Sequence, residues 1–105
     1  MTDILRKLNL ILEDRKNRSS KESYVSSLYD KGLSHVCDKI DEEAEELMMA
    51  IKNESNKRII SEAADLWFHS LVALSMKNLS SDDILEELER RFGTSGHEEK
   101  KNRNT

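Results

Sequence analysis

Two groups of acidic residues stand at helical spacing in the middle of the chain. The earlier group contains Glu42, Glu43, Glu45 and Glu46. The later group is Glu62 and Asp65, three positions apart. Because an α-helix turns by about 100° per residue, acids three or four positions apart lie on one face. Carboxylates crowded in this way repel one another, so each group needs a positively charged partner.

Two kinds of partner can balance these acids. The first is a set of salt bridges from Lys39 or Arg58. The second is a metal ion shared by the acids of both groups, Glu43, Glu46, Glu62 and Asp65. Salt bridges need one base for each acid, and four or five acids converge on few bases, so the metal interpretation is favoured. An all-oxygen ligand set selects a hard cation, Mg²⁺ with Mn²⁺ as a substitute, over Zn²⁺.

Such a metal site suits the hydrolysis of a phosphoanhydride. Mg²⁺ held by carboxylates alone completes its coordination with water and substrate phosphates, neutralises the polyphosphate and activates water. A spare carboxylate, Glu42 or Glu43, would be the general base, and the sequence leaves that choice open. His69, one turn after Asp65, either orients the Asp65 carboxylate or is a core histidine with a satisfied hydrogen bond.

The elements that must position these residues are helices. Apolar spacing predicts five, linked by short connectors, over about 2–14, 23–31, 34–53, 55–77 and 80–93. Gly32 is expected to end the second helix, Ser34 to cap the third, and Ser80 or Ser81 to begin the fifth. The third and fourth helices carry the acids, so the prediction is an all-α bundle of about five helices.

Apolar residues predict which helix faces are buried. The second helix is expected to direct Tyr24 and Leu28 inward. The apolar face of the third is expected to be Val36, Ile40, Ala44, Leu47, Met48 and Ile51. The fourth is apolar over most of its circumference and must be central or shared with another subunit. A few hundred Å² of exposed apolar surface would favour association by several kcal/mol, at roughly 25 cal/mol per Å², so a homodimer is predicted.

Composition limits the class of protein. The chain has 105 residues, no Pro and three Gly, which favours one helical domain. A net charge of −4 argues against general nucleic-acid binding. The absence of a signal peptide or a long apolar run predicts a cytoplasmic protein without a membrane segment. Cys37 stands alone, fits a reducing compartment and is expected to be buried. It shows no zinc-ligand spacing with His35 or His97.

The chain divides into an expected helical domain, residues 1–92, and a polar, basic tail, residues 93–105. Composition alone favours a solvated, mobile end for the tail. The alternative is a basic strap that closes over an anionic substrate, with Thr94, Ser95 and Gly96 offering backbone N–H groups to phosphate.

Several motifs together resemble a known enzyme family. Lys39-x-x-Glu42-Glu43-x-x-Glu46 followed by Glu62-x-x-Asp65 resembles the metal signature of the all-α, MazG-type nucleotide pyrophosphohydrolases. The flanks resemble the phosphoribosyl-ATP pyrophosphatase family of histidine biosynthesis. These flanks are Ser23-Tyr24-Val25, Asp65-Leu66-Trp67-Phe68-His69, and the tail from Arg91 to Arg103. The similarity extends from Leu8 to Arg103.

The resemblance implies Mg²⁺-dependent hydrolysis of phosphoribosyl-ATP to phosphoribosyl-AMP and pyrophosphate by a homodimer. It implies a metal cluster formed by Glu42, Glu43, Glu46, Glu62 and Asp65. It implies that Lys39 faces a phosphate. It further implies contacts to substrate phosphates or ribose from Arg15, Arg91, Ser95, Gly96, Lys100 and Arg103. The chain departs from the family's common residues at Val25, Asp41, Trp67 and Phe68, and none of these departures removes a ligand.

Two other functions remain open from the sequence. One keeps the chemistry and changes the substrate, which gives a general nucleoside-triphosphate pyrophosphohydrolase that also takes deoxynucleotides. The other is a non-catalytic helical dimer that binds a basic partner through the acidic residues of its third helix. The latter predicts no thermal stabilisation by Mg²⁺, whereas a metal site raises the melting temperature by mass action.

Overall fold

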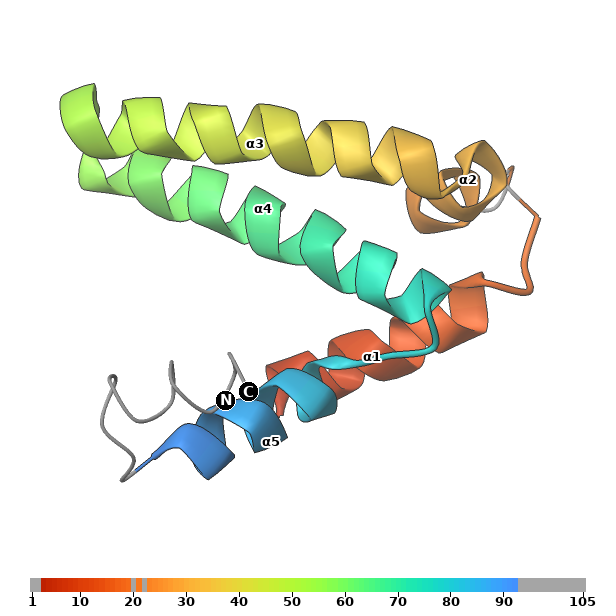
Figure 1. Cartoon of the computed structure of the whole chain (residues 1–105). Helices are drawn as coiled ribbons and strands as arrows, with labels where there is room; N and C mark the ends of the chain where they lie inside the picture. Colours follow the sequence, from red (N-terminus) through yellow and green to blue (C-terminus); the bar gives the residue numbers. More distant parts are fainter. Residues whose placement is uncertain (1–2, 20, 22, 93–105) are drawn as a thin grey trace.

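The computed structural model of the chain describes residues 3–19, 21 and 23–92. Within these ranges it contains five α-helices and no strand (Figure 1). The helices are α1 (Ile4–Arg15), α2 (Tyr24–Lys31), α3 (Leu33–Asn53), α4 (Asn56–Met76) and α5 (Ser81–Arg91). The predicted all-α fold is therefore confirmed, and each helix begins and ends within about two residues of its expected limits.

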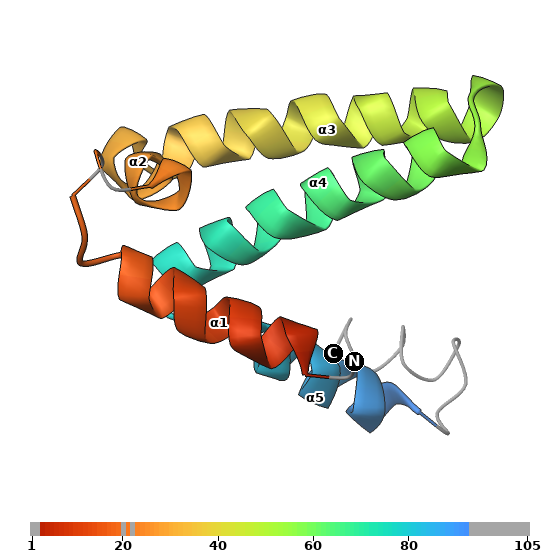
Figure 2. The same cartoon turned by 180° about the vertical axis from the view of Figure 1, so that it is seen from behind.

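The two longest helices form an antiparallel hairpin. Each has 21 residues, and the turn between them is short because the Ser55 side chain accepts a hydrogen bond from the backbone N–H of Arg58 and starts α4 at once. Helices α1 and α5 lie together across the other end of α4 (Figures 1 and 2). A hydrogen bond from Asn9 Nδ2 to Ser81 Oγ, 2.9 Å long, joins that pair.

Helix α2 passes directly into α3 at Gly32. Its φ of +93° is a conformation that side chains with a Cβ rarely adopt, so glycine lets the chain change direction in one residue. The backbone N–H of Val36 already donates to the Gly32 carbonyl, at 3.3 Å. Ser34 thus lies inside the first turn of α3, and its predicted capping role is wrong. Gly32 leaves no room for a separate cap between the helices.

The start of α5 follows the prediction. Ser80 is the cap: its side chain accepts from the backbone N–H of Asp82, and its own N–H donates to Asp83 Oδ2 at 2.9 Å. This reciprocal capping box satisfies N–H groups that have no partner within a helix.

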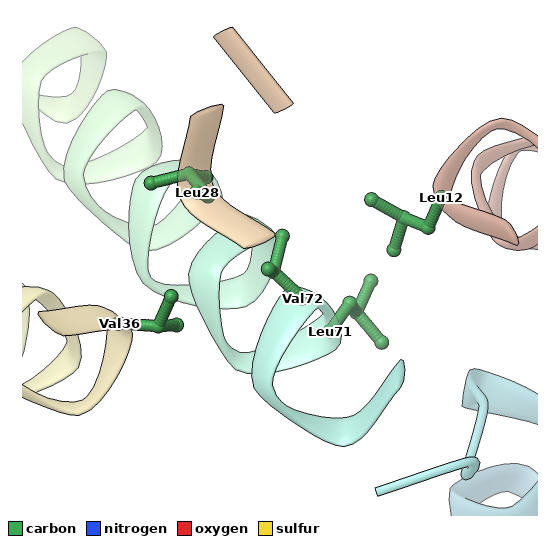
Figure 3. Close-up of a cluster of buried hydrophobic side chains, with 5 residues drawn as sticks. All are labelled: Leu12, Leu28, Val36, Leu71 and Val72. Atoms are coloured by element: carbon green, nitrogen blue, oxygen red, sulfur yellow. The ribbon is translucent and has the colours of Figure 1, made fainter. Parts of the chain in front are cut away.

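The hydrophobic core lies where four helices meet at one end of the hairpin (Figure 3). Its buried side chains come from α1, α2, α3 and α4, and are Leu12, Leu28, Val36, Leu71 and Val72. Farther along α3, towards the α3–α4 turn, Ala50 is the next buried apolar residue. The core therefore holds one half of the hairpin and leaves the other half with little apolar cover.

Three expectations about burial are wrong. Tyr24 is 55% exposed, although its hydroxyl reaches the buried His69 of α4. Cys37 is exposed, since it lies about 100° around α3 from the buried Val36. Met48 and Ile51 keep the predicted spacing, but none of the five described helices covers that side of α3, and both are more than half exposed.

The half of the hairpin that contains the α3–α4 turn and the α1–α5 pair together give the molecule an extended shape (Figure 2). The radius of gyration of its Cα atoms is 16.0 Å, against about 13 Å for a compact chain of this length. Among the helices described, none is long and apolar enough to cross a membrane.

Candidate active site

The hairpin brings the two predicted acidic groups together. We call Glu43 and Glu46 of α3 with Glu62 and Asp65 of α4 the acidic cluster. The charge of Asp65 raises the pKa of both Glu43 and Glu62, and the carboxylate of Glu46 lies within hydrogen-bonding reach of Glu62. Only 9% of Glu43 and 4% of Glu62 is exposed. Acids 16 to 22 positions apart in the sequence thus become neighbours because α3 and α4 run antiparallel.

Glu62 is held by a cation from its own helix. Arg58 Nη2 donates to Glu62 Oε1 at 2.5 Å, one turn away, while Arg58 Nε lies 3.5 Å from Glu54. The other oxygen, Glu62 Oε2, is fully buried and accepts no hydrogen bond. Hydrogen bonding to the Glu46 carboxylate raises the pKa of Glu62, and burial raises it further, while Arg58 opposes both. Two carboxylates this close cannot both be ionised without a balancing cation.

Glu43 contacts a histidine from the facing helix. Its Oε1 lies 2.8 Å from Nδ1 of His69, but the ring N–H is aligned with the backbone carbonyl of Asp65, 3.2 Å away. Glu43 Oε1 is therefore also a buried oxygen without an aligned hydrogen bond. Burial raises the pKa of Glu43, the charge of Asp65 raises it further, and His69 and Lys39 oppose the shift.

The surroundings of His69 fit the second of its two expected roles, a buried histidine with hydrogen-bond partners. It is buried, at 6% exposed, and its Nδ1 lies beside the carboxylate of Glu43, whereas Asp65 offers it a backbone carbonyl. On its other side, Nε2 lies 3.0 Å from the hydroxyl of Tyr24. Sequence reasoning missed Tyr24 as a site residue. Its signals were its place directly after the Ser23 cap and its membership of the Ser23-Tyr24-Val25 flank, and neither reveals what α2 faces.

The acidic cluster has the chemistry of a hard-cation site without a complete coordination shell. Across the part of the chain that the structure describes, no three His, Cys, Asp or Glu side chains converge closely enough to hold a metal. Two observations nevertheless fit a cation: Glu43 Oε1 and Glu62 Oε2 are buried oxygens without hydrogen bonds, and every donor is a carboxylate. Oxygen donors of this kind suit Mg²⁺ or Mn²⁺.

Comparison with known proteins identifies the family. A family model described as phosphoribosyl-ATP pyrophosphohydrolase matches residues 5–92. The chain belongs to this family. The family model covers the acidic cluster and all of the five helices except the first residue of α1, so the family resemblance in the sequence is confirmed, and so is the predicted class of enzyme.

Curated relatives match over almost their whole length. The phosphoribosyl-ATP pyrophosphatase of Vesicomyosocius okutanii is 54% identical over 104 residues, which are 99% of each chain. That of Hydrogenovibrio crunogenus is 52% identical, covering 96% of this chain and 93% of its own. That of Methylococcus capsulatus is 50% identical, covering 96% of both chains.

Two further predicted site residues lie beside the cluster on α3. The positive charge of Lys39 acts on Glu43, which places its ammonium group within electrostatic reach of that carboxylate. Lys39 Nζ also lies 3.8 Å from Glu42 Oε2. The Glu42 side chain is mostly exposed, so Glu42 and Glu43 occupy different surroundings although they are adjacent in sequence.

The two predicted substrate-binding arginines lie at helix ends, apart from the acidic cluster. Arg15 closes α1, where its Nη1 lies 2.9 Å from Asp14. Arg91 closes α5, where its Nε lies 2.9 Å from Glu87. In both whole-chain views the end of α5 lies away from the hairpin (Figures 1 and 2). The remaining predicted contacts lie outside the described residues, and are Ser95, Gly96, Lys100 and Arg103.

Proposed function

We propose that this chain hydrolyses the α–β phosphoanhydride of phosphoribosyl-ATP, with Mg²⁺ held by the acidic cluster. Water adds to phosphorus, the P–O bond breaks, and the products are pyrophosphate and phosphoribosyl-AMP, the second step of histidine biosynthesis. One observation carries the metal assignment: two facing helices each present a buried carboxylate oxygen without a hydrogen bond, Glu43 Oε1 and Glu62 Oε2. Family membership supports the substrate.

The four acids of the cluster would hold the ion. When bound, Mg²⁺ supplies charge neutralisation for the polyphosphate and a lower pKa for water, and Mn²⁺ can replace it. Arg58 binds one oxygen of Glu62 and leaves the other, which is buried and without a hydrogen bond, available to the ion. The protein thus keeps its buried ligand in place before substrate arrives.

The general base is one of two adjacent glutamates. Glu43 is buried against His69 and suits a ligand, whereas Glu42 is exposed and can exchange protons with water. We therefore assign proton removal to Glu42. Lys39 Nζ lies 3.8 Å from Glu42 Oε2, and its positive charge also acts on Glu43. This ammonium group would contact a phosphate of the substrate.

The rest of the substrate would be bound by cations from other parts of the chain. We assign phosphate and ribose contacts to Arg15 and Arg91, and to the tail residues Ser95, Gly96, Lys100 and Arg103. Arg15 and Arg91 already form ion pairs at the ends of α1 and α5, so binding would exchange or extend these pairs.

We further propose that the enzyme is a homodimer. An apolar groove of about 400 Å³ opens between α1, α4 and α5, lined by Leu5, Leu66, Trp67, Ser70, Leu71, Ser81, Ile84, Leu85 and Leu88. Other large apolar side chains are more than half exposed in the half of the hairpin that contains the α3–α4 turn. They are Met48, Met49, Ile51 and Ile60. Exposed apolar surface of this extent, in the groove and near the α3–α4 turn, favours an interface with a second copy of the chain.

Replacement of single cluster acids tests the assignment. Glu62→Gln and Asp65→Asn should lower Mg²⁺-dependent release of pyrophosphate from phosphoribosyl-ATP by about a thousandfold, since a lost ligand removes roughly 4 kcal/mol of transition-state stabilisation. Glu45→Gln, in the same acidic run on an exposed part of α3, is the matched control and should retain activity. Retained activity in both cluster variants would refute the metal assignment. Faster turnover of deoxynucleoside triphosphates than of phosphoribosyl-ATP would refute the substrate.

A further inference from the structure

Three side chains from three helices form a continuous polar chain that ends in the acidic cluster. The hydroxyl of Tyr24, on α2, lies 3.0 Å from Nε2 of His69, on α4. Nδ1 of the same ring lies 2.8 Å from Oε1 of Glu43, on α3. Tyr24 and His69 are 45 positions apart in the sequence, so the chain of contacts exists only in the folded protein.

The partners of the imidazole fix its hydrogen-bonding direction. Nδ1 faces two oxygens that can only accept, the Asp65 carbonyl at 3.2 Å and the Glu43 carboxylate. The neutral ring must therefore carry its proton on Nδ1, which leaves Nε2 as an acceptor. The Tyr24 hydroxyl then donates to Nε2. One tautomer is thus selected from both sides of the ring.

The ring is also fixed by packing. Phe68 meets it edge-on, with ring centroids 5.0 Å apart and planes at 79°, and Tyr24 meets it at 6.2 Å and 89°. His69 is almost fully buried, so little of the ring is open to water. A ring held by two aromatic neighbours and two polar partners cannot rotate freely, and its Nδ1 stays directed at α3.

We propose that Tyr24 and His69 are positioning residues that fix the place of Glu43 Oε1, one of the two buried oxygens assigned to the cation of the acidic cluster. This inference rests on the proposed function, because it takes the cluster as the metal site. Hydrogen-bonding partners one layer outside a metal's ligands orient those ligands and tune metal affinity. Helix α2, which contributes no acid, would then set the geometry of the site through Tyr24.

Tyr24→Phe tests the proposal with little risk to folding, because the side chain is half exposed. The matched control is Tyr29→Phe: Tyr29 lies on the same helix and its hydroxyl also bonds to α4, to Ser75 Oγ at 2.5 Å, away from the cluster. At His69, asparagine can keep a donor near the Nδ1 position, whereas glutamine places its amide nearer to Nε2. The full-length protein is titrated with Mn²⁺ in the absence of substrate, and free Mn²⁺ is measured by electron paramagnetic resonance.

We expect His69→Gln to weaken Mn²⁺ binding by about 10- to 100-fold. Tyr24→Phe should weaken it by about three- to tenfold, since it removes one hydrogen bond a step farther away. His69→Asn should bind Mn²⁺ more tightly than His69→Gln, and adding Tyr24→Phe to His69→Asn should change nothing. Tyr29→Phe should bind like the unmodified protein. A merely structural role would lower the melting temperatures of both tyrosine variants and leave Mn²⁺ affinity unchanged.

Unchanged Mn²⁺ affinity in Tyr24→Phe would overturn the inference, and so would equal affinities for His69→Asn and His69→Gln. Asp65→Asn separates this failure from failure of the proposed function. If Asp65→Asn loses Mn²⁺ binding and Tyr24→Phe retains it, only the positioning role falls. If the unmodified protein binds no Mn²⁺, the metal assignment falls and takes the positioning role with it.

Discussion

The middle of the α3–α4 hairpin and the α1–α5 pair differ in which kind of side chain they bury and which they expose. The hairpin buries charged groups, Glu43 and Glu62, and leaves two of their oxygens without hydrogen bonds. The α1–α5 pair does the reverse, since it exposes apolar side chains such as Leu85 and Leu88 along a groove. Both arrangements cost stability in an isolated protomer.

The difference shows which kind of partner each region lacks. A buried acid is stabilised by a cation, and an exposed leucine by another apolar surface. We therefore expect Mg²⁺ to stabilise the hairpin and a second copy of the chain to stabilise the α1–α5 region. The two effects can be separated by variants that affect one region and spare the other.

The largest effect is expected from a charge placed in the apolar groove. Leu88 is 55% exposed in the protomer and lines the groove beside Trp67, the single tryptophan of the chain. Leu88→Glu would bury an unpaired carboxylate in the dimer, at a cost of about 3 kcal/mol, and should weaken dimerisation by at least about a hundredfold. Sedimentation velocity measures the mass, and Trp67 emission should shift to longer wavelength as the ring becomes wetter.

Leu88→Met is the matched control, because it keeps an apolar side chain of similar volume and should preserve the dimer. If Leu88→Glu sediments as a dimer with unchanged Trp67 emission, the groove does not form the interface. A monomeric unmodified protein at micromolar concentration would remove the dimer altogether.

An intermediate effect is expected from pH in the metal-free protein. Both Glu43 and Glu62 have a pKa above the ordinary value of 4.5 in the folded state, so the folded protein binds more protons than the unfolded chain above that pH. The stability that protonation provides is present at low pH and is lost as the pH rises through the raised values. Glu62→Gln should therefore melt at a higher temperature than the unmodified protein at neutral pH without metal.

Saturating Mg²⁺ should reverse that order, since only the unmodified protein gains stability by binding the ion. Thermal unfolding followed by circular dichroism, with chelator or with Mg²⁺, measures both orders. A metal-free Glu62→Gln variant that is less stable than the unmodified protein at neutral pH would show that Arg58 outweighs the burial and repulsion at this position.

The smallest effect is expected at Glu87, on α5. Arg90 and Arg91 hydrogen-bond its carboxylate and lower its pKa to about 2. Its contribution to stability is therefore present above pH 4.5 and is lost as the pH falls towards 2, opposite in sign to the acidic cluster. Glu87→Gln should lower the melting temperature slightly at neutral pH, because exposed ion pairs contribute little. High salt should remove this difference and leave the effect of Glu62→Gln in place.

Much of the local structure follows from sequence, because local chemistry decides it. Apolar spacing located five helices, Gly32 ended α2, and Ser80 capped α5. Arg58, which the sequence offered as a salt-bridge partner for the acids, forms an ion pair with Glu62 four positions later. These features depend on backbone conformation and on neighbours one turn away.

Tertiary packing decided the rest. Sequence spacing could not show that Tyr24 reaches His69, that His69 lies beside Glu43, or that Cys37 and Met48 are exposed. Such facts depend on which helix covers which face, and residues far apart in the chain determine that. The metal role of the four acids stays a prediction. The sequence by itself determined which groups are present on each helix face, whereas the antiparallel packing of α3 on α4 decided which acids meet, because only packing removes water from between them and makes their charges interact strongly.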